Sequence, residues 1–454
     1  MMFGQLFWFS LFAVAISASY PVLRNVNGFF GLKGFFGMVG PNIKVDKATP
    51  MFELFKGDGI VQGVFFENGT MYPVKHIIRT DKVLYKEKYI CNSPSELKTK
   101  FLALVHDIQI ANRRSLFPNM LGSANTALLS VENKTYALFE QDLPYEINID
   151  IENKNVTTLG KIELAEIHKH VGPYRFSGHT KYDLSEKVIH TIDYNIFTRT
   201  VTYYKLDTNF TILHMLAKKM EYIPIIHDFY VLETGDIMII DSPFKMWPFL
   251  KKELFNPRVF FHHVPLVLRR ELPTHIHILG REPRKFSIDA GFYCFHFGQV
   301  FETKDTIRIC APLYDEFDFN SLNINGKYRE IVIKKKFGSC YLRTSPILET
   351  MNLDFPVRCN KSGHIILRRI IDGRIAGFVI CNGLEIERII DLPDSVSIFG
   401  EHCVKEIDGA THIMAFSKDG SLVLVNMEKD NDVSIVPVFE EGVTLGFHSI
   451  FICL

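Results

Sequence analysis

The stretch "LRRIIDGRIAGFVI", from Leu367 to Ile380, decides the fold class of this 454-residue chain. Two runs rich in β-branched and apolar residues flank the pair Asp372-Gly373. Asp and Gly reach positive φ angles at low cost, so this pair predicts a tight turn between two antiparallel strands. The stretch therefore predicts a β-hairpin.

The same hairpin signature recurs from about residue 50 to the C-terminus. It surrounds the turn pairs Asn68-Gly69, Gly235-Asp236 and Asp419-Gly420. Many hairpins without long intervening helices are typical of a sandwich, a barrel or a propeller. The number of hairpins favours an all-β propeller, whose blades are short antiparallel sheets. No fixed-period repeat in the sequence sets the number of blades.

The composition excludes some classes of function. The 51 Lys and Arg residues balance the 51 Asp and Glu residues, which argues against nucleic acid as a partner, because a phosphate-binding surface normally shows as a basic excess. The 39 Phe residues predict a large core, with part of the excess lining an apolar cavity. The eight Cys residues form no C-x-x-C pair, so neither a zinc site of that type nor a disulfide framework is indicated.

The N-terminus is almost wholly apolar from Met2 to Ala18. It predicts a signal peptide cut after Ser19, or an uncut membrane anchor. We therefore divide the chain into residues 1–19 and a single catalytic propeller domain over residues 20–454. Five N-x-S/T sequons fit a secretory route: Asn68, Asn133, Asn155, Asn209 and Asn360. The expected location is membrane-associated, either through the secretory pathway or on the cytoplasmic face of a membrane.

One region has a helical pattern instead. The segment 93–121, "SPSELKTKFLALVHDIQIANRRSLFPNML", carries apolar residues at helical spacing before Arg113 and Arg114. It predicts either an inserted helix packed on the propeller or an amphipathic helix lying on a membrane surface. Both interpretations stay open.

Four of the 17 histidines stand out by their settings. They are His179 in "FSGHTKYD", His227 in "IIHDFYV", His296 in "FYCFHFGQVFE" and His448 in "LGFHSIF". Each follows apolar or small residues, which is typical of an inward-facing strand end. Their spacing is too wide for a local metal finger, but it suits ligands drawn from four blades onto the axis of a propeller. Any one of them alone would more commonly be a hydrogen-bonded core histidine.

Further segments accompany these histidines in a fixed order. They are "GFFGMVGPN" from Gly34 to Asn42, "FKGDG" from Phe55 to Gly59, Asn125-Thr126, and Glu140 with Pro144-Tyr145. Together with the four histidine settings, they resemble the carotenoid cleavage oxygenase family over roughly residues 34–451. The resemblance implies a seven-bladed β-propeller, with a few helices in loops capping one face and Fe(II) on its axis. His179, His227, His296 and His448 would bind the iron and serve catalysis. Neutral imidazoles suit Fe(II), and four of them leave room for O₂.

In this family three glutamates accept hydrogen bonds from three of the four histidines, and the first histidine has no such partner. Glu140 matches the first glutamate. The second position, in "NLDFPV", is occupied by Asp354, whose side chain is one methylene shorter. The third position falls on Val396 in "DSVSIFGE", and valine cannot accept a hydrogen bond. Glu401 or a water molecule could substitute for it.

The resemblance implies an Fe(II)-dependent dioxygenase that cleaves a conjugated C=C bond of a carotenoid, apocarotenoid or similar apolar polyene with O₂. A membrane surface is an expected partner. Phe229, Phe295 and Phe297 flank the ligands and are candidates for substrate binding, with plain core packing as the alternative. Two other functions remain open: a non-catalytic propeller that binds a lipid or retinoid, and a retinoid isomerohydrolase or stilbenoid-cleaving member of the family. The sequence does not indicate an oligomeric state.

Overall fold

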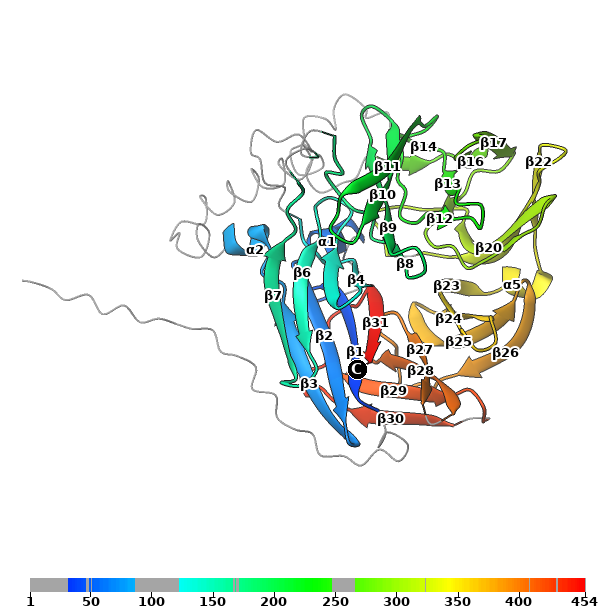
Figure 1. Ribbon diagram of the computed structural model, residues 1–454. Coiled ribbons are helices and arrows are strands. Elements are labelled where there is room, and N and C mark those ends of the chain that lie inside the picture. Colours follow the sequence, from blue (N-terminus) through cyan, green and yellow to red (C-terminus); the bar gives the residue numbers. More distant parts are fainter. Residues whose placement is uncertain are drawn as a thin grey trace, which may run out of the picture.

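The computed structural model describes the greater part of the chain, namely residues 32–45, 49, 51–85, 122–165, 168, 171–246, 266–322, 324–407, 409–429 and 432–453. Within them the regular structure is almost entirely antiparallel β-strand. Seven sheets of four or five strands lie around a common centre (Figure 1). The all-β, seven-bladed propeller that the family resemblance implied is confirmed.

Three blades come from the first half of the chain and from its very end. The first consists of β3 (Thr70–Ile77), β2 (Gly59–Glu67), β1 (Gly34–Pro41) and β31 (His448–Cys453). The second consists of β4 (Ala127–Val131), β5 (Lys134–Leu138), β6 (Tyr145–Asp150) and β7 (Asn155–Lys161). The third consists of β8 (Lys181–Asp183), β9 (Val188–Asn195), β10 (Thr200–Asp207) and β11 (Ile212–Lys219).

Four blades follow in the second half. The fourth consists of β12 (Tyr230–Val231), β13 (Ile237–Asp241), β16 (Thr274–Leu279) and β17 (Arg284–Ile288). The fifth consists of β18 (Tyr293–Cys294), β19 (Gln299–Glu302), β20 (Thr306–Tyr314), β21 (Lys327–Lys334) and β22 (Ser339–Arg343). The sixth consists of β23 (Asn352–Arg358), β24 (Ile365–Ile371), β25 (Arg374–Asn382) and β26 (Glu385–Asp391). The seventh consists of β27 (Cys403–Ile407), β28 (Ala410–Phe416), β29 (Ser421–Asn426) and β30 (Val433–Pro437).

The remaining described elements are short. They are the strand pair β14 (Phe244–Met246) and β15 (Leu266–Leu268), and the helices α1 (Met51–Lys56), α2 (Asp81–Tyr85) and α5 (Pro346–Glu349). No helix within the described ranges is long and apolar enough to cross a membrane. The predicted signal or anchor over residues 1–19 and the predicted helix over 93–121 lie outside the described residues. The membrane surface therefore stays a predicted partner.

The expected turn chemistry is present at the hairpins. Asn68 and Gly69, with φ angles of 51° and 76°, join β2 to β3. Asp372 and Gly373, with φ angles of 51° and 77°, join β24 to β25. Positive φ at both central residues matches the right-handed twist of the flanking strands. The hairpin predicted from "LRRIIDGRIAGFVI" is confirmed.

Pairing between the two ends of the described chain closes the ring of blades. β1 pairs antiparallel with β31, from Gly34 opposite Cys453 to Val39 opposite His448. Gly40 continues this close approach, because a Cβ there would lie 1.9 Å from the carbonyl oxygen of Leu445. The closure fixes the last strand of the chain against the first, and so it places His448 at the centre.

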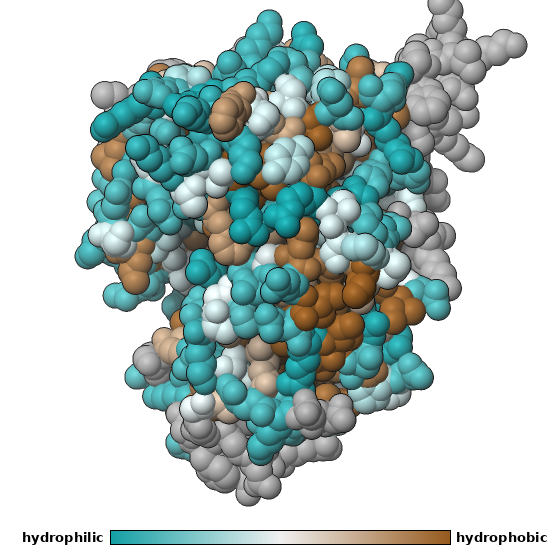
Figure 2. Space-filling model, turned by 90° about the vertical axis from the view of Figure 1, so that its right-hand side faces the viewer, coloured by the Kyte–Doolittle hydropathy of each residue, from teal (hydrophilic) through white to brown (hydrophobic). Residues whose placement is uncertain are grey.

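The hydrophobic core lies between neighbouring blades. Phe36 of β1 stacks on Phe416 of β28 with ring centroids 4.9 Å apart, and this contact joins the first blade to the seventh. Most of the described Phe side chains are buried, which accounts for much of the Phe excess. Figure 2 views the side on which β20, β22 and β26 lie, where a largely hydrophilic surface carries smaller hydrophobic areas and a larger one in the lower right part of the view. The blades pack against one another through apolar side chains. Polar side chains can therefore lie at the ends of the innermost strands, near the axis of the propeller.

Candidate metal centre

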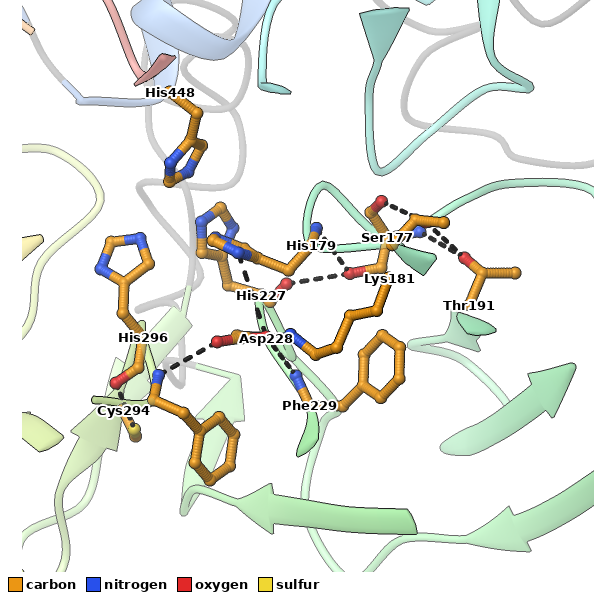
Figure 3. A network of polar contacts seen from close by, with 12 residues as sticks. Ser177, His179, Lys181, Thr191, His227, Asp228, Phe229, Cys294, His296 and His448 are labelled. Carbon is orange, nitrogen blue, oxygen red and sulfur yellow. Dashed lines mark hydrogen bonds and ion pairs between the residues drawn. The ribbon is translucent and has the colours of Figure 1, made fainter. Parts of the chain in front are cut away.

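Four different blades bring the four histidines together. His448 is the first residue of β31, while His179 and His227 lie just before β8 and β12, and His296 lies between β18 and β19. One ring nitrogen from each histidine lies within 4.8 Å of the others. The closest rings are those of His179 and His448, with centroids 4.4 Å apart. Figure 3 shows the imidazoles turned toward one another. The predicted convergence of these four residues on the axis is therefore present.

Three of the rings are oriented by a carboxylate at Nδ1. His227 Nδ1 lies 2.6 Å from Glu140 Oε1, and His296 Nδ1 lies 2.9 Å from Asp354 Oδ1. A carboxylate that holds Nδ1–H fixes the tautomer and leaves Nε2 as a lone-pair donor toward the centre. The Nε2 atoms of His179 and His296 are buried and have no hydrogen-bond partner among the described residues. Buried polar atoms without a partner are rare, and these two fit a metal ion.

The third carboxylate is Glu401. Its Oε1 lies 3.1 Å from His448 Nδ1, and its Oε2 accepts a hydrogen bond from the Ser449 backbone N–H at 2.8 Å. Assigning the third position to Val396 was therefore wrong, because Val396 packs in the apolar core between the sixth and seventh blades. The alternative, that Glu401 substitutes, is correct. Three carboxylates, those of Glu140, Asp354 and Glu401, therefore bond the candidate ligands from outside. Of these three residues, only Asp354 differs from the expected glutamate.

Among the described residues, no carboxylate lies within hydrogen-bond distance of the first histidine, His179. The nearest is Asp228 Oδ1, 4.0 Å from His179 Nδ1. Asp228 already binds Lys181 Nζ at 2.8 Å and accepts the backbone N–H groups of Phe229 and Phe297, at 2.8 Å and 3.0 Å. The side chain of Asp228, at the start of the fourth blade, therefore joins Lys181 of the third blade to Phe297 of the fifth. Figure 3 shows Asp228 beside Lys181 and Phe229. The hydrogen bonds that Asp228 accepts from two backbone N–H groups match a capping role at the strand ends.

The three carboxylates remain ionised. Burial raises the pKa of Glu140, but its hydrogen bond to His227 and the charge of that ring hold the pKa below its ordinary value. Burial also raises the pKa of Asp354 and of Glu401. The interactions of Asp354 with His296 and of Glu401 with His448 outweigh this effect, so the pKa of each carboxyl group is lowered overall. Three negative charges therefore surround the four imidazoles, which favours a divalent cation at the centre.

The aromatic candidates for substrate binding separate into two groups. Phe295 contacts the His227 ring edge-on, with centroids 5.0 Å apart, and packs with Tyr293 and Phe317 at 4.7 Å and 5.0 Å. It therefore belongs to an aromatic cluster beside the centre. Phe229, by contrast, is fully buried in the core between the third and fourth blades, so its assignment to the substrate site was wrong. Its position directly after Asp228 turns its side chain into the blade.

Phe297 packs partly against Tyr230, with ring centroids 5.9 Å apart. It also lines a cavity of about 380 Å³ that reaches His179, His296 and His448. Phe355 was missed from the sequence, although its ring lies 4.7 Å from that of His296 and 5.4 Å from that of His448. The sequence feature that could have indicated Phe355 is its place in the "DFP" motif, immediately after Asp354. Phe295 and Phe355 therefore contact the ligand rings directly.

Metal bound at this centre is expected to stay bound well below pH 6.5. Burial, and then the positive charge of the other rings, lowers the pKa of His179 well below 6.5, and burial likewise lowers the pKa of His296. A lowered pKa keeps the imidazole neutral at a lower pH, so protons compete with the metal only in more acidic solution. Metal content after dialysis at a series of pH values from 7.5 to 4.5 measures this. Half-release at or above pH 6.5 would contradict the expectation.

Comparison of the sequence with known proteins identifies a family to which this chain is similar. Residues 31–361 match the model of a family described as retinal pigment epithelial membrane protein. The carotenoid 9,10(9',10')-cleavage dioxygenase 1 of Arabidopsis thaliana is 31% identical over 320 residues, which cover 67% of this chain and 56% of that protein. The Pisum sativum protein of the same name is 27% identical over 237 residues, which cover 51% of this chain and 42% of that protein. The matched part thus spans about half the length of these relatives.

Solved structures share the fold over nearly the whole chain. A variant of Synechocystis apocarotenoid oxygenase aligns with a TM-score of 0.72 at 15% identity and covers 97% of both chains. The lignostilbene dioxygenase of Pseudomonas brassicacearum aligns with a TM-score of 0.70 at 16% identity and covers 96% of both chains. At such low identity these two show the fold alone. The family model, in contrast, matches residues 31–361, which is more than half of the chain. The chain therefore belongs to the retinal pigment epithelial membrane protein family, that of the carotenoid cleavage oxygenases.

Proposed function

We propose that this protein is an Fe(II)-dependent dioxygenase that cleaves a conjugated C=C bond of an apolar polyene, such as a carotenoid or apocarotenoid, into two carbonyl products. The observation that carries the proposal is the set of four converging imidazoles, three of them oriented by carboxylates. Neutral nitrogen donors of this kind suit Fe(II). Ferrous iron held there would supply the activation of O₂.

The chain's own residues account for the rest of the task. Glu140, Asp354 and Glu401 hold the ring tautomers, so that each of these imidazoles keeps Nε2 toward the centre. The cluster of Phe295, Tyr293 and Phe317 forms an apolar, aromatic wall beside His227, and we place the flat conjugated chain against it. Such a wall also excludes water from the reacting bond. No side chain has to donate or abstract a proton.

The names of related proteins support this substrate class. The curated relatives are named for the cleavage of carotenoids, and one solved structure of the same fold is a lignostilbene dioxygenase. A further solved structure is a cobalt-substituted form of the Synechocystis enzyme, with a TM-score of 0.70. We infer that a long apolar polyene is the substrate and that a stilbene-type compound is the second one to test. Delivery of the substrate from a membrane surface belongs to the same proposal.

The test is turnover by the full chain loaded anaerobically with Fe(II). A panel of carotenoids, apocarotenoids, a stilbene and a retinyl ester is added under ¹⁸O₂, and the products are identified by mass spectrometry. We expect two carbonyl products that carry the label from at least one polyene, and no product from a His448→Ala variant. Isomerised or hydrolysed retinyl ester without label would instead identify an isomerohydrolase. Bound iron and a bound polyene without any product would favour the non-catalytic binding protein.

Phe295→Leu separates substrate binding from metal binding. Loss of the ring opens the aromatic wall, while no metal ligand or carboxylate is touched. We expect KM for the active polyene to rise several-fold at unchanged iron content. Phe229→Leu is the matched variant, because Phe229 also lies two residues after a candidate ligand, His227, but is buried in the core between the third and fourth blades. Equal effects of the two substitutions would contradict the placement of the substrate beside Phe295.

A further inference from the structure

Arg368 of β24 is a buried cation next to the candidate metal centre. Its side chain belongs to a residue that is only 5% exposed, and its position on β24 lies directly opposite Asp354 of β23. A charged group is seldom buried to this degree without a specific reason, because removing it from water is costly. Burial lowers the pKa of Arg368 to about 10, while the carboxylates of Asp354 and Glu401 act in the opposite direction. Arg368 therefore remains positively charged at neutral pH.

The contacts of Arg368 hold the neighbours of two outer carboxylates. Its Nη1 donates a hydrogen bond to the Gly400 carbonyl oxygen at 2.7 Å, and Gly400 directly precedes Glu401. Its guanidinium carbon lies 3.4 Å from the centroid of the Phe355 ring, and Phe355 directly follows Asp354. One side chain thus joins the sixth blade, which carries Asp354, to the backbone that carries Glu401.

Phe355 extends this arrangement to the ligands. Its φ angle of 54° is unusual for a bulky residue, and such a conformation persists only where surrounding contacts hold it. The guanidinium covers the face of its ring, and the same ring lies against His296 and His448. A planar guanidinium can stack and donate hydrogen bonds at the same time, which a lysine ammonium cannot do.

The charges give Arg368 a second effect. Glu140, Asp354 and Glu401 contribute three negative charges, and Arg368 contributes one positive charge. Asp228 is balanced by Lys181 and adds nothing net. The three carboxylates and Arg368 together would carry two net negative charges, which would match a divalent cation. A trivalent cation would leave a buried excess of positive charge, so Arg368 favours the divalent state.

We propose that Arg368 is a positioning residue of the metal centre, which clamps the segments carrying Asp354 and Glu401 and stabilises the divalent state of the bound ion. This inference rests on the proposed function only in that a divalent metal must bind. It assigns a role to a side chain that contacts no metal ligand directly. The clamp matters because Asp354 has a shorter side chain than glutamate. If its segment moved, Asp354 could not extend far enough to keep its hydrogen bond to His296.

The test compares two substitutions at Arg368 with one at its neighbour. Arg368→Lys keeps the positive charge but loses the planar guanidinium that stacks on Phe355 and donates to the Gly400 carbonyl oxygen. Arg368→Met loses the charge as well. Arg369→Met is the matched control, because Arg369 is adjacent on β24, points to the opposite face and pairs with Asp391. The melting temperature of each metal-free full-length variant shows that it is folded.

Two readouts other than turnover are measured on each protein. Titration with Co(II) gives the metal affinity, and redox titration of the iron-loaded protein gives the Fe(III)/Fe(II) potential. We expect Arg368→Lys to weaken Co(II) binding by about tenfold, the low end of the effect of an outer-shell change. We expect Arg368→Met to shift the potential to more negative values. Arg369→Met should match the wild-type chain in both measurements.

Either shift at Arg368 without a corresponding shift at Arg369 supports the inference. It is overturned if both Arg368 variants stay within twofold of the wild-type affinity at an unchanged potential, or if Arg369→Met produces the same shifts. If Arg368→Met does not fold, the affinity of Arg368→Lys alone decides. A wild-type chain that binds neither Co(II) nor Fe(II) would instead contradict the proposed function, so the two failures are distinguishable.

Discussion

Replacing His227 with alanine is expected to abolish stoichiometric binding of iron and all turnover. The substitution removes one of four ligands, and it also removes the partner of Glu140 Oε1, which bonds His227 Nδ1 at 2.6 Å; the hydrogen bond from Thr126 to Oε2 then remains. Loss of an outer-shell partner alone typically costs about 10–100-fold in metal affinity. Loss of the ligand itself must cost more. Elemental analysis of protein purified anaerobically with Fe(II) measures the effect.

Two further variants separate loss of the ligand from loss of the fold. Removing the donor of a hydrogen bond to a largely buried carboxylate commonly destabilises a protein by about 1–3 kcal/mol, so His227→Ala should also lower the melting temperature of the metal-free chain. Adding Glu140→Gln removes the unpaired charge, and it should return most of the stability without returning the metal. His214→Ala, on the exposed strand β11, should bind iron like the wild-type chain. Iron at wild-type levels in His227→Ala would exclude the four-histidine centre.

Glu401→Gln is expected to weaken metal binding by about 10–100-fold, because Glu401 orients the His448 ring. The amide keeps the size of the side chain but loses the negative charge, and its oxygen is a weaker acceptor for the Nδ1–H group. The backbone N–H of Ser449 also loses its carboxylate acceptor. Titration of the metal-free protein with Co(II) measures the affinity.

Val396→Ala is the matched control for Glu401→Gln. The sequence motif placed the third outer residue at Val396, whereas the structure places Val396 in an apolar core. Its truncation should lower the free energy of unfolding by about 1–3 kcal/mol through loss of buried methyl groups, and it should leave the Co(II) affinity unchanged. A loss of affinity in Val396→Ala with none in Glu401→Gln would reverse the assignment.

The sequence predicted the fold well because β-hairpins carry local signals. Pairs such as Asn68-Gly69 and Asp372-Gly373 need positive φ at two successive residues, and few residue types allow it. A ring of blades repeats such hairpins, so a local signal read many times indicated the architecture. The family resemblance supplied the number of blades, which the hairpins alone did not give.

The outer shell of the site was harder to predict. Glu140 and Asp354 were found because each lies in a motif whose spacing from the neighbouring residues is kept. Glu401 was only an alternative, because the segment before it offered Val396 as a competing match at a distance of five residues. An acceptor must lie within about 3 Å of His448 Nδ1, and only the packing of β31 against β1 and the seventh blade decides which side chain reaches it.

By itself, then, the sequence determined the β-hairpins and, through its resemblance to a family, the four histidines and two of their three carboxylates, since each of these residues lies in a short, ordered motif. Tertiary structure alone decided that Glu401 replaces Val396, that Phe229 belongs to the core while Phe355 faces the ligands, and that Arg368 lies between two carboxylates. These facts depend on contacts across blades and on which face of a strand a side chain takes. Such contacts join residues that are distant in the chain, so no local pattern contains them.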